Sequence, residues 1–357
     1  MINLKERLDT DTILKEKYRI ENLDNSIIPL ECIISQECNL QCKHCYFGDK
    51  LPSKNQLAIN EWISIIENSI QNGIKHFHFS GKEPLLNNDL FPILNYISER
   101  KDKYGLFYGI VSNGVSVEKH IYENLLLTNL DYIEFSIEGT KDINDFIRGS
   151  NHFDKLITIL DSLLPNDKIS TSTTLSEINK NHFLDLMDIL IEKKVTKIFA
   201  APVLFVGSAT QSSLNMISPI DFLNLIENSI KKITQLKHTN HKIDLRFCIS
   251  DFYTEYLISN EHFMSEKLKL HLEYGEPIHW NIDGHIVEVV LQFVDMPFVK
   301  QLVITADGYI LSGADDIDKS NYYELSLANV RSCDFDFSKI MKFRKKYIND
   351  YFTNLIG

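Results

Sequence analysis

The sequence has no long apolar run, no excess of positive charge and few cysteines. No stretch approaches the roughly 18 consecutive apolar residues that a membrane span needs. The N-terminus, MINLKERLDTDTILKEKY, is charged throughout and lacks the apolar core of a signal peptide. The net charge of −12 argues against nucleic acid as the main partner, because phosphate contacts need clustered Lys and Arg. We therefore expect a cytoplasmic protein that binds neither a membrane nor a nucleic acid.

Cysteine is scarce, with six residues in 357, and three of the six fall within eight positions. A disulfide framework would need a small secreted chain with paired spacings, and this sequence has neither. In a reducing compartment, three closely spaced thiols indicate ligation of a metal or a cluster.

The sequence also lacks low-complexity segments and Pro/Gly/Ser-rich linkers. What it contains is a repeated pattern of a β-rich run, a polar turn and an amphipathic helix. Six runs rich in Ile, Val, Phe, Tyr or Thr are strand candidates: Pro29–Ser35, Lys75–Phe79, Leu106–Val111, Tyr132–Ser136, Lys168–Thr174 and Lys197–Pro202.

Helical patterns lie between these runs, at Asn60–Gln71, Asp89–Lys103, Val117–Thr128, Phe153–Leu164 and Asn181–Lys194. Alternating strands and helices imply parallel strands joined by right-handed crossovers. The predicted fold is thus α/β, a partial (β/α)6 barrel with a C-terminal α+β extension. We expect an N-terminal segment at 1–27, the barrel at 28–210 and a cap or substrate region at 211–357.

The C-terminal region has a looser pattern. Pro219–Leu236 and Asp251–Leu272 look helical, and Lys242–Cys248 between them is strand-like. Gln301–Ser312 predicts a hairpin, because Asp-Gly is a turn signal between two apolar runs. Asp336–Tyr351 predicts a closing helix.

Cys38, Cys42 and Cys45 have the spacing CxxxCxxC directly after the first predicted strand. Three thiolates bind three irons of a 4Fe–4S cubane and leave the fourth iron open, as a catalytic site requires. The alternative is a zinc site with Cys32 or His44 as the fourth ligand.

Polar, glycine-containing segments follow four successive predicted strands: 36–48, 80–84, 112–114 and 136–139. In α/β barrels the chemistry gathers at the C-terminal ends of the strands. These four segments are therefore expected on one active-site rim. His76 and His78 alternate with phenylalanines on the second strand, where we expect packing against helices with a hydrogen-bonded ring nitrogen.

CxxxCxxC followed by an aromatic residue, here Tyr46, resembles the signature of the radical S-adenosylmethionine (SAM) superfamily, in particular the branch with a SPASM or twitch extension. FSGKEPLL at 79–86 resembles the GGEP segment of that family, VSNG at 111–114 its TNG segment, SIEG at 136–139 its SIDG segment and DFIRG at 145–149 its DxxRG segment.

The resemblance implies a set of contacts with S-adenosylmethionine: Tyr46, Ser80, Gly81, Lys82, Glu83, Asn113, Ser136, Glu138 and Arg148. Glu83 would hold the amino group of the methionine moiety and Arg148 would face its carboxylate. Ser136 and Glu138 would lie near the ribose.

Two departures from the family pattern stand out. Lys82 replaces the second glycine of GGEP and is expected to reshape the methionine pocket. The segment 301–316 resembles the SPASM/twitch hairpin but has no cysteine where auxiliary-cluster ligands would stand. The expected count is one 4Fe–4S cluster, held by Cys38, Cys42 and Cys45.

The implied function is reductive cleavage of S-adenosylmethionine to a 5′-deoxyadenosyl radical, which abstracts a hydrogen from a substrate carbon. A ribosomally made peptide is the first expected substrate, modified by epimerisation, crosslinking or a similar reaction. A small molecule such as an amino sugar or nucleoside is the second. A non-enzymatic Fe–S or zinc module is a remote third. An electron donor such as flavodoxin or ferredoxin is an expected partner.

Cys248 ends a strand-like run, a position that faces the active rim of a barrel. It is a candidate to return a hydrogen atom to a substrate radical, because a redox-neutral epimerisation without an auxiliary cluster needs such a donor. The alternative is a small buried apolar residue.

Overall fold

The computed structural model describes residues 28–48, 55–236, 242–250, 253, 256, 278–292, 301–313, 316–317 and 322–356. The expected N-terminal segment 1–27 and nearly all of the expected helix Asp251–Leu272 lie outside this set. Among the described residues, no helix is both long enough and apolar enough to cross a membrane.

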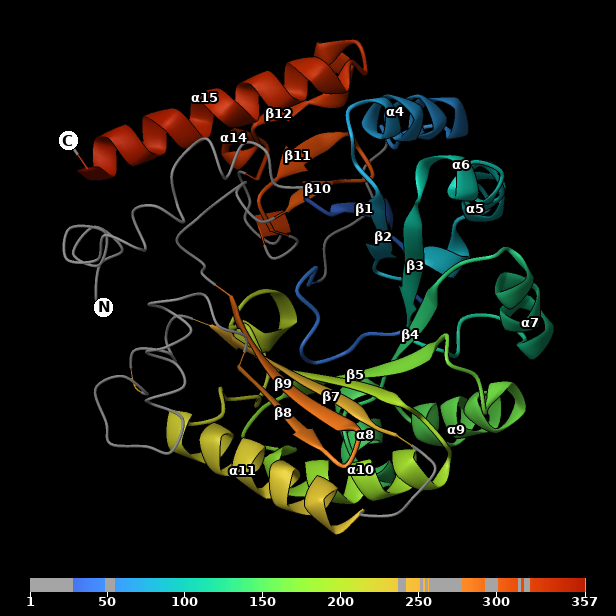
Figure 1. Cartoon of the computed structure of the whole chain (residues 1–357), viewed down its shortest axis with the longest axis vertical. Coiled ribbons are helices and arrows are strands. Elements are labelled where there is room, and N and C mark those ends of the chain that lie inside the picture. Colours follow the sequence, from blue (N-terminus) through green and yellow to red (C-terminus); the bar gives the residue numbers. More distant parts are fainter. Residues whose placement is uncertain are drawn as a thin grey trace.

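The strands form one twelve-stranded sheet, in the order β12-β11-β10-β1-β2-β3-β4-β5-β6-β7-β9-β8 (Figure 1). Their bounds are β1 Leu30–Ser35, β2 His76–Gly81, β3 Phe107–Ser112, β4 Tyr132–Ser136, β5 Ile169–Leu175, β6 Lys197–Pro202, β7 Asp244–Ser250, β8 Ile278–Ile282, β9 His285–Gln292, β10 Leu302–Ile304, β11 Tyr309–Leu311 and β12 Ala328–Asn329.

Strands β10, β1–β7 and β9 are parallel to one another, whereas β8, β11 and β12 pair antiparallel at the two edges. Strands β1–β6 lie side by side in chain order, so their C-terminal ends meet on one rim. The sheet curls with its helices outside, and the partial α/β barrel predicted from the sequence is confirmed (Figure 1).

The helices cover the outer face of the sheet, and α15 crosses the C-terminal strands (Figure 1). Their bounds are α4 Ile59–Gln71, α5 Leu90–Ser98, α6 Lys101–Tyr104, α7 Lys119–Leu127, α8 Lys141–Arg148, α9 His152–Leu163, α10 Phe183–Glu192, α11 Pro219–Gln235, α14 Tyr322–Leu325 and α15 Phe337–Ile356. Short 3-10 turns are η1 Pro84–Leu86, η2 Lys180–His182, η3 Gly207–Gln211 and η5 Val330–Cys333.

Phenylalanines and histidines alternate along β2, so they lie on opposite faces of the sheet. Phe77 and Phe79 have no exposed surface and belong to the main hydrophobic core with α4 and α5. His76 and His78 are half-buried and point the other way. The Tyr132 Oη lies 2.6 Å from Nδ1 of His78 and 3.4 Å from Nε2 of His76. The expected hydrogen bond is present, but the histidines face the inside of the barrel and not the helices.

Most expected elements are found within a few residues of their predicted bounds. The helix expected over Asp89–Lys103 is instead two helices, α5 and α6, separated by Glu99 and Arg100. Helix α8 and the strands β8 and β9 were not predicted. Strands β7 and β9 continue the barrel sheet past residue 210, and the division of the chain at that residue stays a proposal.

Gly109 on β3 gives room to β4. A Cβ atom at this position would lie 2.5 Å from the Tyr132 carbonyl oxygen and 2.6 Å from its ring. Gly109→Ala should therefore lower the free energy of unfolding by about 1–3 kcal/mol, the usual cost of overpacking. Urea denaturation measures this. A Gly109→Ala variant that is as stable as the parent would contradict the expected clash.

Candidate active site on the barrel rim

The three clustered cysteines lie in the loop that follows β1, on the concave side of the sheet (Figure 1). This loop is tied to several barrel units by backbone contacts. Lys43 N donates to Ile147 O at 2.9 Å, and Ser208 N donates to Cys45 O at 2.8 Å. The Asn39 side chain donates to Val115 O at 3.1 Å. The loop thus crosses the rim from β3 to β6.

Donor groups and cations surround the thiols. Leu40 N lies 3.3 Å from the Cys38 Sγ, and Asn113 Nδ2 lies 3.7 Å from the same atom. Arg148 Nη1 lies 3.9 Å from the Cys42 Sγ. Burial raises the pKa of Cys42 to about 12, although the nearby Arg148 charge opposes this rise. A thiolate here needs compensating positive charge, which a cluster iron supplies when it binds.

Among the described residues, no three His, Cys, Asp or Glu side chains gather closely enough to hold one metal ion. A cubane distributes its cysteine ligands over separate irons, so its fit depends on what surrounds each sulfur. N–H groups aimed at the sulfurs, as at Cys38, are contacts that tune such clusters. The half-buried cysteine loop with these donors fits a 4Fe–4S cluster.

The Ser80–Glu83 segment ends β2 beside the end of β1. Gly81 has a φ of +146°, and a Cβ atom there would lie 2.4 Å from the Ser35 carbonyl oxygen. Lys82 N donates to the same oxygen at 3.0 Å. The first glycine of the motif is therefore required by a close backbone approach, whereas the Lys82 position tolerates a side chain.

Glu83 is completely buried beneath this turn. Its carboxylate accepts hydrogen bonds from Asn113 N at 2.8 Å, Ser112 Oγ at 3.0 Å and Leu85 N at 3.2 Å. Burial raises its pKa, and these donors lower it in part. Glu83 thus caps η1 and joins the ends of β2 and β3, while its contact with a methionine ammonium stays a prediction.

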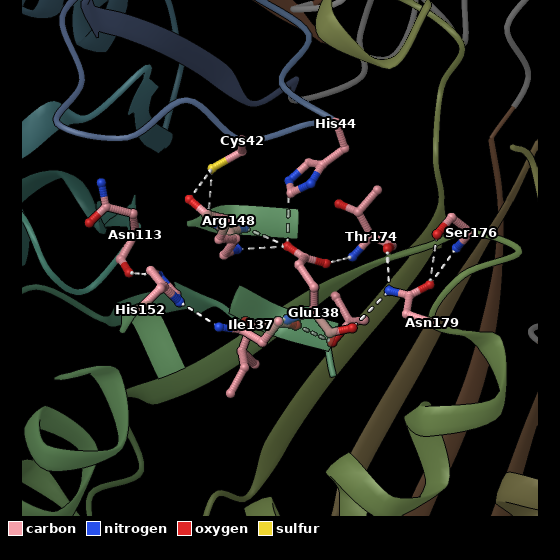
Figure 2. Close-up of polar contacts among 12 residues, drawn as sticks. Cys42, His44, Asn113, Ile137, Glu138, Arg148, His152, Thr174, Ser176 and Asn179 are labelled. Atoms are coloured by element: carbon pink, nitrogen blue, oxygen red, sulfur yellow. Dashed lines mark hydrogen bonds and ion pairs between the residues drawn. The ribbon is translucent and has the colours of Figure 1, made fainter. Parts of the chain in front are cut away.

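Glu138 and Arg148 form a buried ion pair at the end of β4 (Figure 2). Oε1 of Glu138 lies 2.9 Å from Nε and 2.5 Å from Nη2 of Arg148, and Thr174 N donates to Oε2 at 2.7 Å. Burial disfavours the charged carboxylate, but Arg148 and His44 outweigh it and hold the pKa of Glu138 below its ordinary value. Arg148 is buried and not on the surface, and its guanidinium joins Glu138 to Cys42.

A second chain of contacts holds Asn113 (Figure 2). Its carbonyl oxygen lies 2.8 Å from Nε2 of His152, whose Nδ1 lies 2.9 Å from Nδ2 of Asn144. Asn144 Oδ1 accepts from Glu138 N at 3.0 Å. Burial lowers the pKa of His152 to about 4, so the ring is neutral at pH 7. The ends of β3 and β4 are therefore fixed relative to each other.

The remaining predicted residues also lie near this rim. Tyr46 is half-buried in the cysteine loop, with its ring 4.7 Å from that of Phe47. Ser136 ends β4, in register with Ser172. Cys248 lies near the C-terminal end of β7.

Cys248 shares its half-buried face of β7 with Arg246, which lies 2.8 Å from Glu288. Phe247 points outward instead, against Phe183 and Phe222 of the helices. Cys248 therefore faces the inside of the barrel.

Sequence reasoning did not select His44 as part of this network, nor Asn144 or His152. His44 Nε2 lies 3.5 Å from Glu138, and burial lowers its pKa to about 4. Its position inside CxxxCxxC was the available signal. Asn144 and His152 flank the DxxRG segment, but only the fold shows that they contact each other.

Comparison with known proteins places this rim in a family. Residues 32–190 match the family model described as Radical SAM superfamily. These residues are similar to this superfamily of enzymes, and the prediction of the superfamily and branch from the motifs is confirmed.

Curated relatives include the Fe-coproporphyrin III synthase of Methanosarcina barkeri, 26% identical over 181 residues, and the PqqA peptide cyclase of Rhizobium meliloti, 23% identical over 212 residues. These matches cover 50% and 57% of this chain, and 44% and 55% of the relatives. The chain thus spans about half the length of the curated relatives it matches.

Solved structures with a similar fold include Streptococcus suis SuiB. SuiB bound to precursor peptide SuiA gives a TM-score of 0.62 at 18% identity, over 86% of this chain and 64% of SuiB. SuiB bound to S-adenosylmethionine gives a TM-score of 0.61 at 17% identity, over 81% of this chain and 61% of SuiB.

Glu138→Gln should destabilise the protein by about 3–5 kcal/mol at pH 7, because Arg148 would remain buried without its counter-charge. The folded-state pKa of Glu138 is lowered, so its contribution is present above the unfolded-state pKa of about 4.3 and is lost as pH falls. The difference in urea denaturation between the parent and the variant should shrink below about pH 4.

Asp154→Asn is the control for this prediction. It removes the charge from an ion pair with Lys141 in which both side chains are 53% exposed, so stability should hardly change. A loss for Glu138→Gln that is equally small, or that persists unchanged at low pH, would show that the pair is not stabilising.

Proposed function

We propose that the chain binds one 4Fe–4S cluster through Cys38, Cys42 and Cys45 and binds S-adenosylmethionine beside it. The main support for this proposal is the position of the cysteine loop on the C-terminal rim. There Asn113 is directed at the Cys38 sulfur and Arg148 at the Cys42 sulfur. The matched superfamily supports the same two cofactors. When bound, the cluster supplies the electron that splits S-adenosylmethionine into methionine and a 5′-deoxyadenosyl radical.

The protein's own residues orient the reactants and exclude water from the rim. Glu138 keeps the Arg148 guanidinium beside Cys42, and Glu83 fixes the backbone of Asn113 beside Cys38. The proposed contacts with S-adenosylmethionine are those that the motifs imply: Tyr46, Ser80, Gly81, Lys82, Glu83, Asn113, Ser136, Glu138 and Arg148.

The proposed substrate is a ribosomally made peptide, from which a carbon-bound hydrogen is abstracted. Two comparisons support a peptide: one relative is named a peptide cyclase, and SuiB has been solved with a precursor peptide. A reduced flavodoxin or ferredoxin is the proposed electron donor.

Anaerobically reconstituted protein should contain about four irons and four sulfides per chain, as one cubane requires. With dithionite and S-adenosylmethionine it should release methionine and 5′-deoxyadenosine, measured by liquid chromatography. Replacing Cys38, Cys42 and Cys45 with Ala should abolish both the iron and the products. Cys333→Ala, at a buried cysteine of η5 in the main hydrophobic core, should retain both. About eight irons, or stoichiometric zinc, would overturn the single-cluster proposal.

Cys248 is proposed as a hydrogen-atom donor to the substrate radical. In this step the S–H bond breaks, a C–H bond forms, and the electron donor with a proton restores the thiol. In deuterated water, with a peptide that supports turnover, Cys248→Ala should still form 5′-deoxyadenosine. Mass spectrometry of the peptide should show that solvent deuterium is no longer incorporated; unchanged label would exclude this role.

A further inference from the structure

The segment Cys45–Phe47 is contacted from two sides by parts of the chain far away in sequence. One contact comes from the β10–β11 hairpin and the other from the loop that follows β6. We propose that these two contacts form a clamp that positions Cys45, so that the C-terminal region orders the third ligand of the cluster. This inference rests on the proposed function for the cluster, but the clamp itself is a property of the protein.

The first side of the clamp is apolar. Phe47 is 2% exposed and belongs to a small hydrophobic cluster with Ile33, Val303, Leu311 and Ile317, separate from the main core. Cys45, Tyr46 and Tyr322 pack at its edge. The C-terminal segment therefore buries the residue two positions after a predicted cluster ligand.

Strand register explains why the hairpin makes this contact. Val303 and Leu311 are opposite each other, so their side chains project from the same face. Their neighbours Ile304 and Ile310, also opposite each other, project from the other face into the main core. Strand β10 pairs parallel with β1, directly before the cysteine loop. The hairpin thus fills the main core with one face and seats Phe47 with the other.

The hairpin turn is itself fixed. Asp307 is buried and accepts hydrogen bonds from Thr305 Oγ1 at 2.6 Å and from Tyr322 Oη at 2.5 Å. Arg331 Nη1 donates to the Asp307 carbonyl oxygen at 3.4 Å, and Arg331 Nε donates to Glu61 at the start of α4 at 2.7 Å. The apolar side of the clamp is therefore anchored to the first βα unit of the barrel.

The second side of the clamp is a backbone contact. The Cys45 carbonyl oxygen accepts from Ser208 N at 2.8 Å and from Gly48 N at 3.1 Å. Gly207 has a φ of +56°, and a Cβ atom there would lie 2.2 Å from the Cys45 oxygen and 2.6 Å from the Tyr46 oxygen. Only glycine permits the loop after β6 to approach this closely.

Both clamp contacts are only a few covalent bonds from the Cys45 sulfur, so they affect its position. Phe47 is two residues from Cys45, and the Cys45 carbonyl oxygen is held by Ser208 N and Gly48 N. Moving Phe47 therefore moves the backbone that carries Cys45, and moving the Cys45 carbonyl changes the direction of its side chain. Hydrogen bonds to sulfur tune the potential of an iron–sulfur cluster. Gly207, Phe47 and Leu311 are thus positioning residues.

The test compares two matched pairs of full-length variants. Leu311→Ala is compared with Ile310→Ala, which removes a buried side chain from the opposite face of the same strand. Gly207→Ala is compared with Gly105→Ala, whose φ of +63° gives similar backbone strain but whose Cβ meets no atom within 4 Å. Both members of each pair lose stability, so stability alone does not separate them.

The first readout is the alkylation rate of each cysteine by iodoacetamide in cluster-free protein, followed by mass spectrometry. Leu311→Ala and Gly207→Ala should speed alkylation of Cys45 by about tenfold through easier local opening, with Cys38 unchanged. Ile310→Ala and Gly105→Ala should leave Cys45 near the parent rate. Equal acceleration within each pair, or none in any variant, would overturn the clamp.

The second readout is the electron paramagnetic resonance spectrum and midpoint potential of the reduced, reconstituted cluster. These should change in Leu311→Ala and Gly207→Ala and stay at the parent values in the two controls. If the parent assembles no cubane while the Cys45 alkylation pattern holds, the proposed function fails and the clamp stands. If every variant has the parent cluster and parent alkylation, the clamp fails and the proposed function stands.

Discussion

The Glu138 carboxylate is buried, and many contacts on the rim keep it ionised. A side chain with no exposed surface stays ionised only if positive charge and hydrogen-bond donors reach it. Arg148 brings the charge from the end of α8, Thr174 brings a backbone donor from β5, and His44 contacts it from the cysteine loop. Four segments therefore meet at one carboxylate, and the cysteine loop cannot shift without disturbing the barrel.

Close backbone approaches complete this arrangement. At Gly81 the end of β2 lies against Ser35, and at Gly207 the loop after β6 lies against Cys45. A cluster-binding loop needs such support because three separated thiols must keep their relative positions before any cofactor links them. Neither contact involves a cysteine side chain, which leaves the sulfurs available as ligands.

The segment 301–316 resembles a SPASM or twitch hairpin, which would be expected to hold an auxiliary cluster. In this structure its contribution to the site is packing. Without cysteines for an auxiliary cluster, the hairpin provides apolar side chains to two separate hydrophobic clusters. Its strands also extend the barrel sheet beyond β1. In this chain the hairpin that resembles such an extension is continuous with the sheet that carries the cysteine loop.

The sequence by itself determined the elements and motifs that depend on local chemistry. The alternation of strands and helices predicted the order β1–β6, because parallel crossovers permit few arrangements, and CxxxCxxC predicted the loop on the rim. Only the tertiary structure decided which distant groups meet. Arg148 contacts the sulfur of Cys42, 106 positions away, and Phe47 meets Leu311 because β10 lies beside β1. The separation of α5 from α6 and the strands β8 and β9 could likewise not be predicted from the sequence, because packing and strand pairing outweigh local propensity. Contacts between residues more than a hundred positions apart leave no periodic signal in a single sequence.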